Sequence, residues 1–194
     1  MMKVLLCTGG IGSGKSFVVA ILRAMGCPAY DCDARAKALY DEDPQLLAEV
    51  VALAGREVLG ADGKLDRKAL AARLFADPAL RAQVEQRVHP AVIRDFSAWK
   101  AHQKGPFLVL ESAILLEHPQ YRDIYDKVLV VSAPDEVRIA RVMARDGAPR
   151  EAVLQRMASQ WSEAKRRAKA DFILENDGEQ PLLPQLNSIW KKLI

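Results

Sequence analysis

Residues 3–16 read Lys-Val-Leu-Leu-Cys-Thr-Gly-Gly-Ile-Gly-Ser-Gly-Lys-Ser, an apolar run that passes directly into a glycine-rich segment. A short apolar run that ends in such a turn predicts a buried β-strand at residues 3–8. Apolar residues then recur almost all round a predicted helix at 17–25, and Gly26 is placed to end that helix. Strand, glycine-rich loop and helix in this order form the context in which phosphate-binding loops occur.

The glycine-rich segment matches the pattern G-x-x-x-x-G-K-[ST]. Glycines let the backbone curl so that successive N–H groups point at phosphate oxygens, and the helix N-terminus adds its positive end. Lys15 can then reach the β- and γ-phosphates of ATP, and the Ser16 hydroxyl can coordinate Mg²⁺. The alternative is a glycine-rich turn without a ligand, which the agreement of pattern and context disfavours. The predicted ATP-binding residues of this segment are Gly10, Ile11, Gly12, Ser13, Gly14, Lys15, Ser16 and Phe17.

Further short apolar runs alternate with longer helical stretches, which predicts an α/β fold with a parallel sheet of about five strands and helices on both faces. The second strand is expected at 27–31, and the clearest buried runs are Phe-Leu-Val-Leu-Glu at 107–111 and Lys-Val-Leu-Val-Val-Ser at 127–132. A weaker strand is expected at 171–175. With its phosphate loop, this pattern predicts a P-loop NTPase-type sheet.

Two helical segments interrupt the strands of this single predicted unit, residues 1–194. Residues 34–105 are too long for a simple crossover and predict a helical substrate-binding insert. Within it Leu65-Asp66-Arg67 opens one helix, and Asp77 is the expected N-cap of another that has Pro78 at its first position. Residues 135–168 predict a lid that Gly147-Ala148-Pro149 divides into two helices.

The phosphate loop by itself does not separate kinases from GTPases or ATPases. A GTPase is expected to carry Asn-Lys-x-Asp and Asp-x-x-Gly, and neither motif occurs in the chain. An Asp-Glu pair closing an apolar strand and an ABC-type Ser-Gly-Gly are absent as well. The small size and the arginine-bearing lid therefore favour a small-molecule kinase.

Two acidic residues stand where parallel strands end, which is where ligands bind in open α/β sheets. Asp33, in Asp31-Cys32-Asp33, can orient an acceptor hydroxyl and accept its proton. Alternatively, Asp31 or Asp33 is the N-cap of a helix that begins at Ala34. Glu111 can orient the waters of a magnesium ion, or it can be a simple strand-end cap.

Basic residues provide a second group of candidates. Arg138, Arg141 and Arg145 are spaced by three and four residues and share one helix face, where they can neutralise a transferring phosphoryl group. A solvated basic face is the alternative for these arginines. His89-Pro90, in a helical region, is expected from spacing to reflect packing and a helix break rather than catalysis.

Charge, apolar runs and cysteine spacing limit the partners and the compartment that we expect for the protein. The formal net charge is +3, which suits an anionic substrate but does not indicate a nucleic-acid partner. No window approaches the length of a membrane span, and the apolar run at 4–7 is too short for an export signal. The three cysteines lack CxxC spacing, so we expect reduced thiols in a cytoplasmic protein.

Taken together, the segments resemble the dephospho-coenzyme A kinase family along nearly the whole chain. Besides the phosphate loop and Asp31-Cys32-Asp33, the resemblance rests on Asp62-Gly63-Lys64-Leu65-Asp66-Arg67 and on Phe75-Ala76-Asp77-Pro78. It extends through Glu85 with His89-Pro90, Arg141 to Gly147, Gln160, Ala170-Asp171, and Asn176 with Gly178. The order and spacing of these short matches make the resemblance specific.

The resemblance implies ATP-dependent phosphorylation of the 3′-hydroxyl of dephospho-coenzyme A, the last step of coenzyme A biosynthesis, with Mg²⁺ as cofactor. Asp33 would face the 3′-hydroxyl as the base, and Lys15 and Arg141 would bind the transferring phosphate. By the same resemblance, Arg67 and His89 would lie on the acceptor side. Asn176 and Gly178 would lie near the adenine of ATP. The expected partners are ATP and dephospho-coenzyme A, and the protein is expected to be a monomer or a small homo-oligomer.

The chain departs from the family pattern at two places. The family usually has Asp-x-Pro-Leu-Leu after the third strand, where this chain reads Glu111-Ser112-Ala113-Ile114-Leu115-Leu116. Glu111 would then reach the magnesium ion through water. Phe17 stands where threonine is usual, so a hydroxyl is lost while the backbone N–H remains.

Two rival functions are another small-molecule kinase and a nucleotide-binding regulator without turnover.

Overall fold

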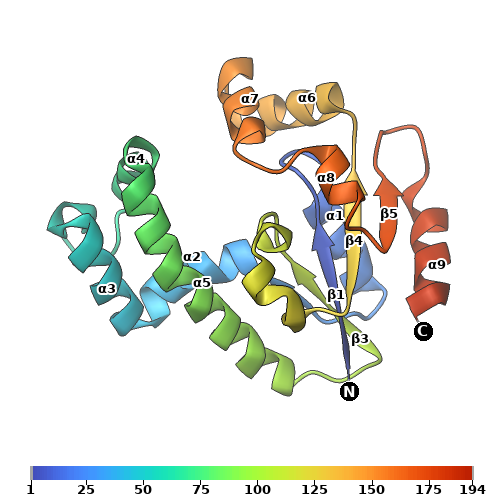
Figure 1. Cartoon of the computed structure of the whole chain (residues 1–194), viewed down its shortest axis with the longest axis horizontal. Coiled ribbons are helices and arrows are strands. Elements are labelled where there is room, and N and C mark those ends of the chain that lie inside the picture. Colours follow the sequence, from blue (N-terminus) through green and yellow to red (C-terminus); the bar gives the residue numbers. More distant parts are fainter. Residues whose placement is uncertain (1, 194) are drawn as a thin grey trace. The chain divides into compact units, whose positions relative to one another are not determined.

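The computed structural model describes residues 2–193 (Figure 1). They form two compact units, one built from the residues up to Asp31 together with those from Gln103 onward, the other from Cys32–His102. The first unit contains the sheet, and the second is helical.

The first unit is built around five parallel strands in the order β2-β3-β1-β4-β5. The strands are β1 (Lys3–Thr8), β2 (Ala29–Asp31), β3 (Phe107–Glu111), β4 (Lys127–Ser132) and β5 (Phe172–Glu175). Because all strands are parallel, their carboxyl ends meet at one edge of the sheet. The predicted α/β fold with five parallel strands is confirmed.

Both faces of the sheet are buried, which explains why its strands read as continuous apolar runs. Helices α1 (Lys15–Ala24) and α9 (Leu182–Leu193) cover one face, where they pack on alternate residues of the strands. Alternate residues between these, such as Leu6, Leu108 and Val130, are fully buried on the opposite face. Helix α8 (Glu163–Arg167) packs against β4, and Arg167 donates from Nη1 to Ser132 Oγ on this second face at 2.9 Å.

The junction between α1 and β2 differs slightly from the expectation. Gly26, at φ 91°, ends the helix as predicted, and its N–H donates to the Arg23 carbonyl. The next N–H, that of Cys27, donates to the Leu22 carbonyl, so Cys27 belongs to the helix cap. The strand therefore begins at Ala29 rather than at Cys27.

The second unit consists of α2 (Cys32–Glu42), α3 (Pro44–Ala54), α4 (Arg67–Ala76) and α5 (Pro78–Ala101), with a 3₁₀ turn η1 (Arg56–Val58). Asp77 is the N-cap of α5 as predicted, since its side chain accepts from the N–H groups of Ala79 and Leu80. Asp43 and Asp66 cap α3 and α4 in the same way. Each cap satisfies N–H groups that a helix start leaves without a partner.

In this unit, the N-cap alternative for Asp33 and the helix break predicted at His89-Pro90 were wrong. Helix α2 begins at Cys32 rather than Ala34, so Asp33 lies inside its first turn and is not its N-cap. His89-Pro90 does not break the helix, because the 24-residue helix α5 continues through Pro90. The proline removes one helical N–H, but Val88, Ala91 and Val92 around it are buried and their packing keeps the helix continuous.

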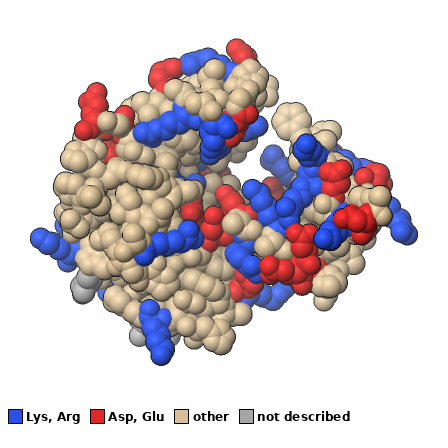
Figure 2. Space-filling view, turned by 180° about the vertical axis from the view of Figure 1, so that it is seen from behind, with Lys and Arg blue, Asp and Glu red and all other residues tan. Residues whose placement is uncertain are grey.

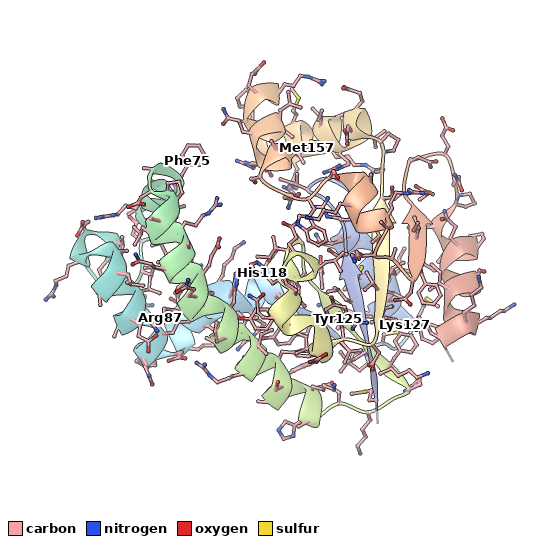
Figure 3. The ribbon with its side chains drawn as sticks, in the orientation of Figure 1. Phe75, Arg87, His118, Tyr125, Lys127 and Met157 are labelled. Carbon is pink, nitrogen blue, oxygen red and sulfur yellow. The ribbon has the colours of Figure 1, made fainter. Side chains whose placement is uncertain are left out.

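Residues 135–168 form three helices rather than the predicted two. Helices α6 (Asp135–Asp146) and α7 (Arg150–Ala158) are separated at Gly147-Ala148-Pro149 as expected, and α8 follows as a third. The first two pack together through Ile139, Val142 and Val153, and Met157 lies on α7 at this contact (Figure 3). Ser162 accounts for the additional helix, because its side chain accepts from the Lys165 N–H and caps α8.

Two 3₁₀ segments, η2 (Leu115–Glu117) and η3 (Pro119–Ile124), connect β3 to β4. Within residues 2–193, no helix combines the length and the apolar character needed to cross a bilayer. Helix α5, the longest at 24 residues, has buried positions on one side and charged residues such as Arg81, Glu85 and Arg87 exposed or half-exposed.

Candidate active site

The glycine-rich loop leaves β1 at the carboxyl edge of the sheet and enters α1. Gly12 and Gly14 have φ angles of 80° and 87°, in the left-handed region that favours glycine. Gly12 lies within a turn that is closed by the Ser13 N–H, which donates to the Gly10 carbonyl at 3.1 Å. The loop, the start of α1 and part of α6 line a hollow of about 210 Å³. The predicted phosphate loop thus has the backbone shape that its residues suggested.

Close packing is a second reason why glycine is required at these positions. A Cβ added to Gly12 would collide with the backbone of Arg138, and one added to Gly14 would collide with the side-chain amide of Asn176. Gly10 lies equally close to the Arg138 guanidinium. The loop is therefore wrapped by side chains from α6 and from the segment after β5, both distant in sequence.

Lys15, Ser16 and Glu111 meet at the end of the central strands. The Ser16 hydroxyl donates to Glu111 Oε1 at 2.7 Å, and Lys15 Nζ lies 3.9 Å from the same oxygen. Glu111 ends β3 and is only 5% exposed, so its charge is compensated in a site with little water. Burial, and then the nearby Glu111 carboxylate, raise the pKa of the Cys7 thiol beneath the loop to about 12, while Lys15 acts in the opposite direction.

The three arginines of α6 have different surroundings. Arg141 is half-buried and donates from Nη1 to the Asn176 carbonyl at 2.9 Å. Arg145 is exposed and pairs with Asp146, and both Arg141 and Arg145 line the hollow beside the loop. Arg138 is only 3% exposed and donates to the Ile11 carbonyl, so a solvated basic face is wrong for this arginine.

Asn176 joins the loop to Arg141. Its Nδ2 donates to the Ser13 carbonyl at 2.8 Å, its carbonyl accepts from Arg141, and its N–H donates to the Ser132 carbonyl. The side chain is buried, and this contact explains why an amide stands at the position. Gly178 follows in a turn at φ 97°, a conformation that side chains rarely adopt.

The helical unit holds the three remaining candidates. Asp33 is exposed in the first turn of α2, and His89 is half-buried within α5. Arg67 is the first residue of α4, where Nη2 donates to Asp41 Oδ2 at 2.6 Å and to the Lys37 carbonyl at 3.1 Å. With Lys64 and Lys68, it lines a second hollow of about 640 Å³ within this unit.

Local backbone geometry explains the residue types of the Asp-Gly-x-Leu-Asp-Arg segment. Asp62 accepts from the Lys64 N–H, Gly63 adopts φ 76°, and Asp66 caps α4. The segment is thus a tight turn followed by a capped helix start, and it presents Arg67 at the first helical position. On the face shown in Figure 2, basic and acidic side chains of the helical unit lie among one another, in agreement with ion pairs such as Arg35–Asp95.

The structure thus brings together the loop, Glu111, Arg141 and Asn176 within the first unit, to which Gly178 also belongs, while Asp33, Arg67 and His89 belong to the second. Two residues contact the loop in a way that sequence reasoning did not foresee: Arg138, named only as one of three arginines on a helix face, and Gln160, named only through the family resemblance. Arg138 had one local signal, an aspartate three residues earlier with which it pairs at 2.9 Å. Gln160 had none besides the family resemblance, because its contact with Ile11 joins residues 149 positions apart.

Comparisons with known proteins show the family to which the chain belongs. A sequence model of the dephospho-CoA kinase family matches residues 3–181. A dephospho-CoA kinase of Bacteroides fragilis (strain YCH46) is 41% identical over 180 residues, which cover 92% of this chain and 87% of that protein. The crystal structure of TT1252 from Thermus thermophilus is 36% identical, with a TM-score of 0.87 and coverage of 100% of this chain and 98% of that one.

A more distant structure, the dephospho-CoA kinase from Campylobacter jejuni, shares the fold. It has a TM-score of 0.67 at 24% identity and covers 100% of this chain and 96% of its own. The family match extends over the phosphate loop, both helical segments and the Asn176 turn, so it includes every element of the candidate site. The chain is a member of the dephospho-CoA kinase family, whose enzymes are ATP-dependent kinases.

Proposed function

We propose that the protein transfers the γ-phosphate of ATP to the 3′-hydroxyl of dephospho-coenzyme A, giving coenzyme A and ADP. The observation that carries this proposal is the joined set of phosphate loop, Glu111, Arg141 and Asn176 in a chain of this family. The set supplies amide donors and two cations around one hollow, as a triphosphate requires. The reaction would be the last step of coenzyme A biosynthesis.

On the ATP side, residues 10–17 would surround the phosphates. Lys15 and Arg141 flank the hollow and would neutralise charge on the transferring phosphoryl group. Asn176 and Gly178 would lie near the adenine, while Asn176 also keeps Arg141 directed toward the loop. The family's threonine is replaced by Phe17, an exposed ring on the wall of the hollow.

Oxygen donors in the site fit a magnesium ion. Ser16 offers a hydroxyl, and Glu111 offers a carboxylate 2.7 Å from it. Mg²⁺ prefers such hard ligands and is usually held by one or two protein groups together with waters and substrate phosphates. Ser16 would bind the ion directly and Glu111 through water. When bound, the ion would neutralise charge on the β- and γ-phosphates.

On the acceptor side, Asp33 would hydrogen-bond the 3′-hydroxyl and accept its proton as the oxygen attacks the γ-phosphorus. The exposure of Asp33 leaves its carboxylate accessible, and its place in the first turn of α2 puts it next to the helix N-terminus. Arg67 and His89 would bind the acceptor. Arg67 is supported in this role because Asp41 holds its guanidinium in one orientation beside Lys64 and Lys68.

Catalysis in this proposal comes from position and charge. The reacting oxygen and ADP would lie in line with the γ-phosphorus, Asp33 would take the proton, and the bond electrons would leave with ADP. Lys15 and Arg141 would balance the negative charge that spreads over the phosphoryl oxygens. The helices at 135–168 would act as a lid that excludes water during transfer.

The decisive experiment incubates the purified protein with Mg-ATP and dephospho-coenzyme A and detects coenzyme A by mass, with CMP, AMP and adenosine as competing acceptors. We expect coenzyme A to be the preferred product. Transfer to a nucleotide instead would indicate another small-molecule kinase. ATP binding without any phosphorylated product would indicate a nucleotide-binding regulator.

Two further expectations complete the proposal. Three buried free cysteines suit a reducing compartment, which supports the cytoplasm as the location. A monomer or small homo-oligomer is expected, and sedimentation of the purified protein would measure which of these forms.

A further inference from the structure

In the phosphate loop, the backbone N–H and the backbone carbonyl of Ile11 are both hydrogen-bonded to side chains. The N–H of Ile11 donates to Gln160 Oε1 at 2.9 Å, and the carbonyl of Ile11 accepts from Arg138 Nε at 3.0 Å. Both partners come from the segment 135–168, more than 120 residues away along the chain. The tip of the loop is therefore fixed by long-range contacts as well as by its own glycines.

Arg138 is itself held firmly. Its Nη1 pairs with Asp135 at 2.9 Å one helical turn earlier, and the side chain is 4% exposed. Its guanidinium lies against Gly10, where no Cβ would fit. An arginine so enclosed has little freedom to leave Ile11, which makes it a rigid support for the loop.

Gln160 is anchored through its neighbours. The next residue, Trp161, donates its N–H to Glu117 Oε1 at 3.0 Å, and Arg166 Nη2 donates to the same oxygen at 3.2 Å. Arg166 is 1% exposed, and burial lowers its pKa, an effect that Glu117 and Glu163 oppose. The guanidinium of an arginine keeps its charge despite this burial. A guanidinium and a carboxylate that are buried together bind each other tightly.

These contacts connect the phosphate loop to the segment that follows β3. Gln160 contacts the loop, and the adjacent Trp161 contacts Glu117, six residues after Glu111. Loss of the Ile11 contact would leave a half-buried N–H without its acceptor and allow the loop tip to rotate. A loop that is not ordered in advance binds its ligand less tightly.

We propose that Gln160 and Arg138 form a clamp on the backbone N–H and carbonyl of Ile11 that holds the phosphate loop in its ATP-binding shape. Gln160 is a positioning residue in this scheme, and the Ile11 N–H serves the clamp rather than a phosphate oxygen. The amides of Gly12, Gly14, Lys15 and Ser16 then remain to bind phosphate. The inference rests on the proposed ATP-binding function of the loop and does not depend on the identity of the acceptor.

The test uses Gln160→Met, which keeps the length of the side chain but replaces the amide oxygen by a weak acceptor. ATP affinity is measured by calorimetry without any acceptor, and exchange of the Ile11 amide hydrogen is measured by NMR. We expect ATP to bind about fivefold more weakly and the amide to exchange about fivefold faster, the size of one lost hydrogen bond. Turnover at saturating ATP should stay within about twofold of wild type, because the clamp acts on binding.

Two variants make the result specific. Gln160→Glu retains an acceptor oxygen at the same reach, so exchange of the Ile11 amide should return to nearly the wild-type rate. Gln155→Met, on an exposed position of α7, is the matched control and should change neither quantity. Wild-type Ile11 exchange and wild-type ATP affinity in Gln160→Met would overturn the clamp. ATP binding and amide exchange decide this even if no coenzyme A is formed, so the two proposals fail separately.

Discussion

The hydroxyl of Ser16 donates a 2.7 Å hydrogen bond to the carboxylate of Glu111, although 95 residues separate them. Parallel pairing of β1 with β3 brings Cys7 opposite Glu111, so the loop that leaves β1 passes over the end of β3. A hydroxyl and a buried carboxylate thus meet where magnesium is proposed to bind. Glutamate, one methylene longer than the family's usual aspartate, makes this contact directly.

We expect Glu111→Gln to lower kcat by about 10- to 100-fold, the usual range when a group that orients a metal is altered. The amide keeps the size of the side chain but loses the charge that would order magnesium-bound water. Turnover as a function of Mg²⁺ concentration checks this, and the midpoint should shift upward. Glu175→Gln, another acid at a strand end, serves as the control; equal losses in both variants would contradict a specific role for Glu111.

Lys15→Ala should weaken ATP binding and also reduce turnover. The ammonium group is largely buried beside Glu111, and within residues 2–193 no other lysine lines the hollow at the loop. Loss of a charged contact of this kind typically costs about 1.5–3 kcal/mol, or roughly 10- to 100-fold in affinity. Calorimetry with ATP and initial rates measure the two effects. Lys191→Ala on α9 is the matched control, and wild-type kinetics in Lys15→Ala would refute the phosphate loop assignment.

Asp33→Asn should preserve ATP binding and abolish most turnover. The amide can still hydrogen-bond the acceptor hydroxyl but cannot take its proton, and general bases typically contribute about 10²- to 10⁴-fold. Single-turnover formation of coenzyme A checks the prediction. Asp123→Asn, also at an exposed aspartate, is the control. Unchanged turnover in Asp33→Asn would remove this residue from the proposed mechanism.

The cysteines predict how the fold responds to alkaline pH. Burial raises the pKa of Cys7 from 9.0 to about 12 and that of Cys27 from 9.0 to about 11. Since both pKa values are higher in the folded state, their contribution to stability is complete below pH 9 and is lost as pH rises from 9 toward 12. Urea unfolding at several pH values measures this loss.

Thiol titration with a colorimetric disulfide reagent gives an independent check. At pH 8 the native thiols should react far more slowly than those of the urea-unfolded chain, because all three are buried and burial also raises the pKa values of Cys7 and Cys27. Cys7→Ser and Cys27→Ser should each reduce the alkaline loss. Rapid reaction of Cys7 in the native protein would show that the site beneath the loop is open.

Asp77→Ala should lower the free energy of unfolding by about 1 kcal/mol, the usual effect of losing an N-cap. The Asp77 carboxylate accepts hydrogen bonds from two N–H groups at the start of α5. Asp77→Ser should retain most of this stability, because serine is also a good N-cap. Denaturant unfolding followed by circular dichroism compares the two variants. Equal stability of Asp77→Ala and wild type would show that the cap is not needed.

Local patterns were sufficient for much of the fold. Lys3–Thr8, Phe107–Glu111 and Lys127–Ser132 form strands over the residues expected, because short apolar runs are typical of parallel strands that are buried on both faces. The Asp77 cap and the Gly26 helix end follow equally local chemistry. Patterns failed at Pro90, where a local rule predicts a break, but tertiary packing of the flanking residues keeps the helix intact.

The phosphate loop itself was readable from residues 9–16, since its glycines, lysine and serine are neighbours and their chemistry is local. Its surroundings were not. The bonds of Glu111 to Ser16, Asn176 to Ser13 and Gln160 to Ile11 each span 95 or more residues, and only the order of the strands and the packing of α6 to α8 bring these groups within reach. Sequence periodicity tells which face of an element is buried but not which polar side chain it will meet there, because that depends on the three-dimensional path of the whole chain.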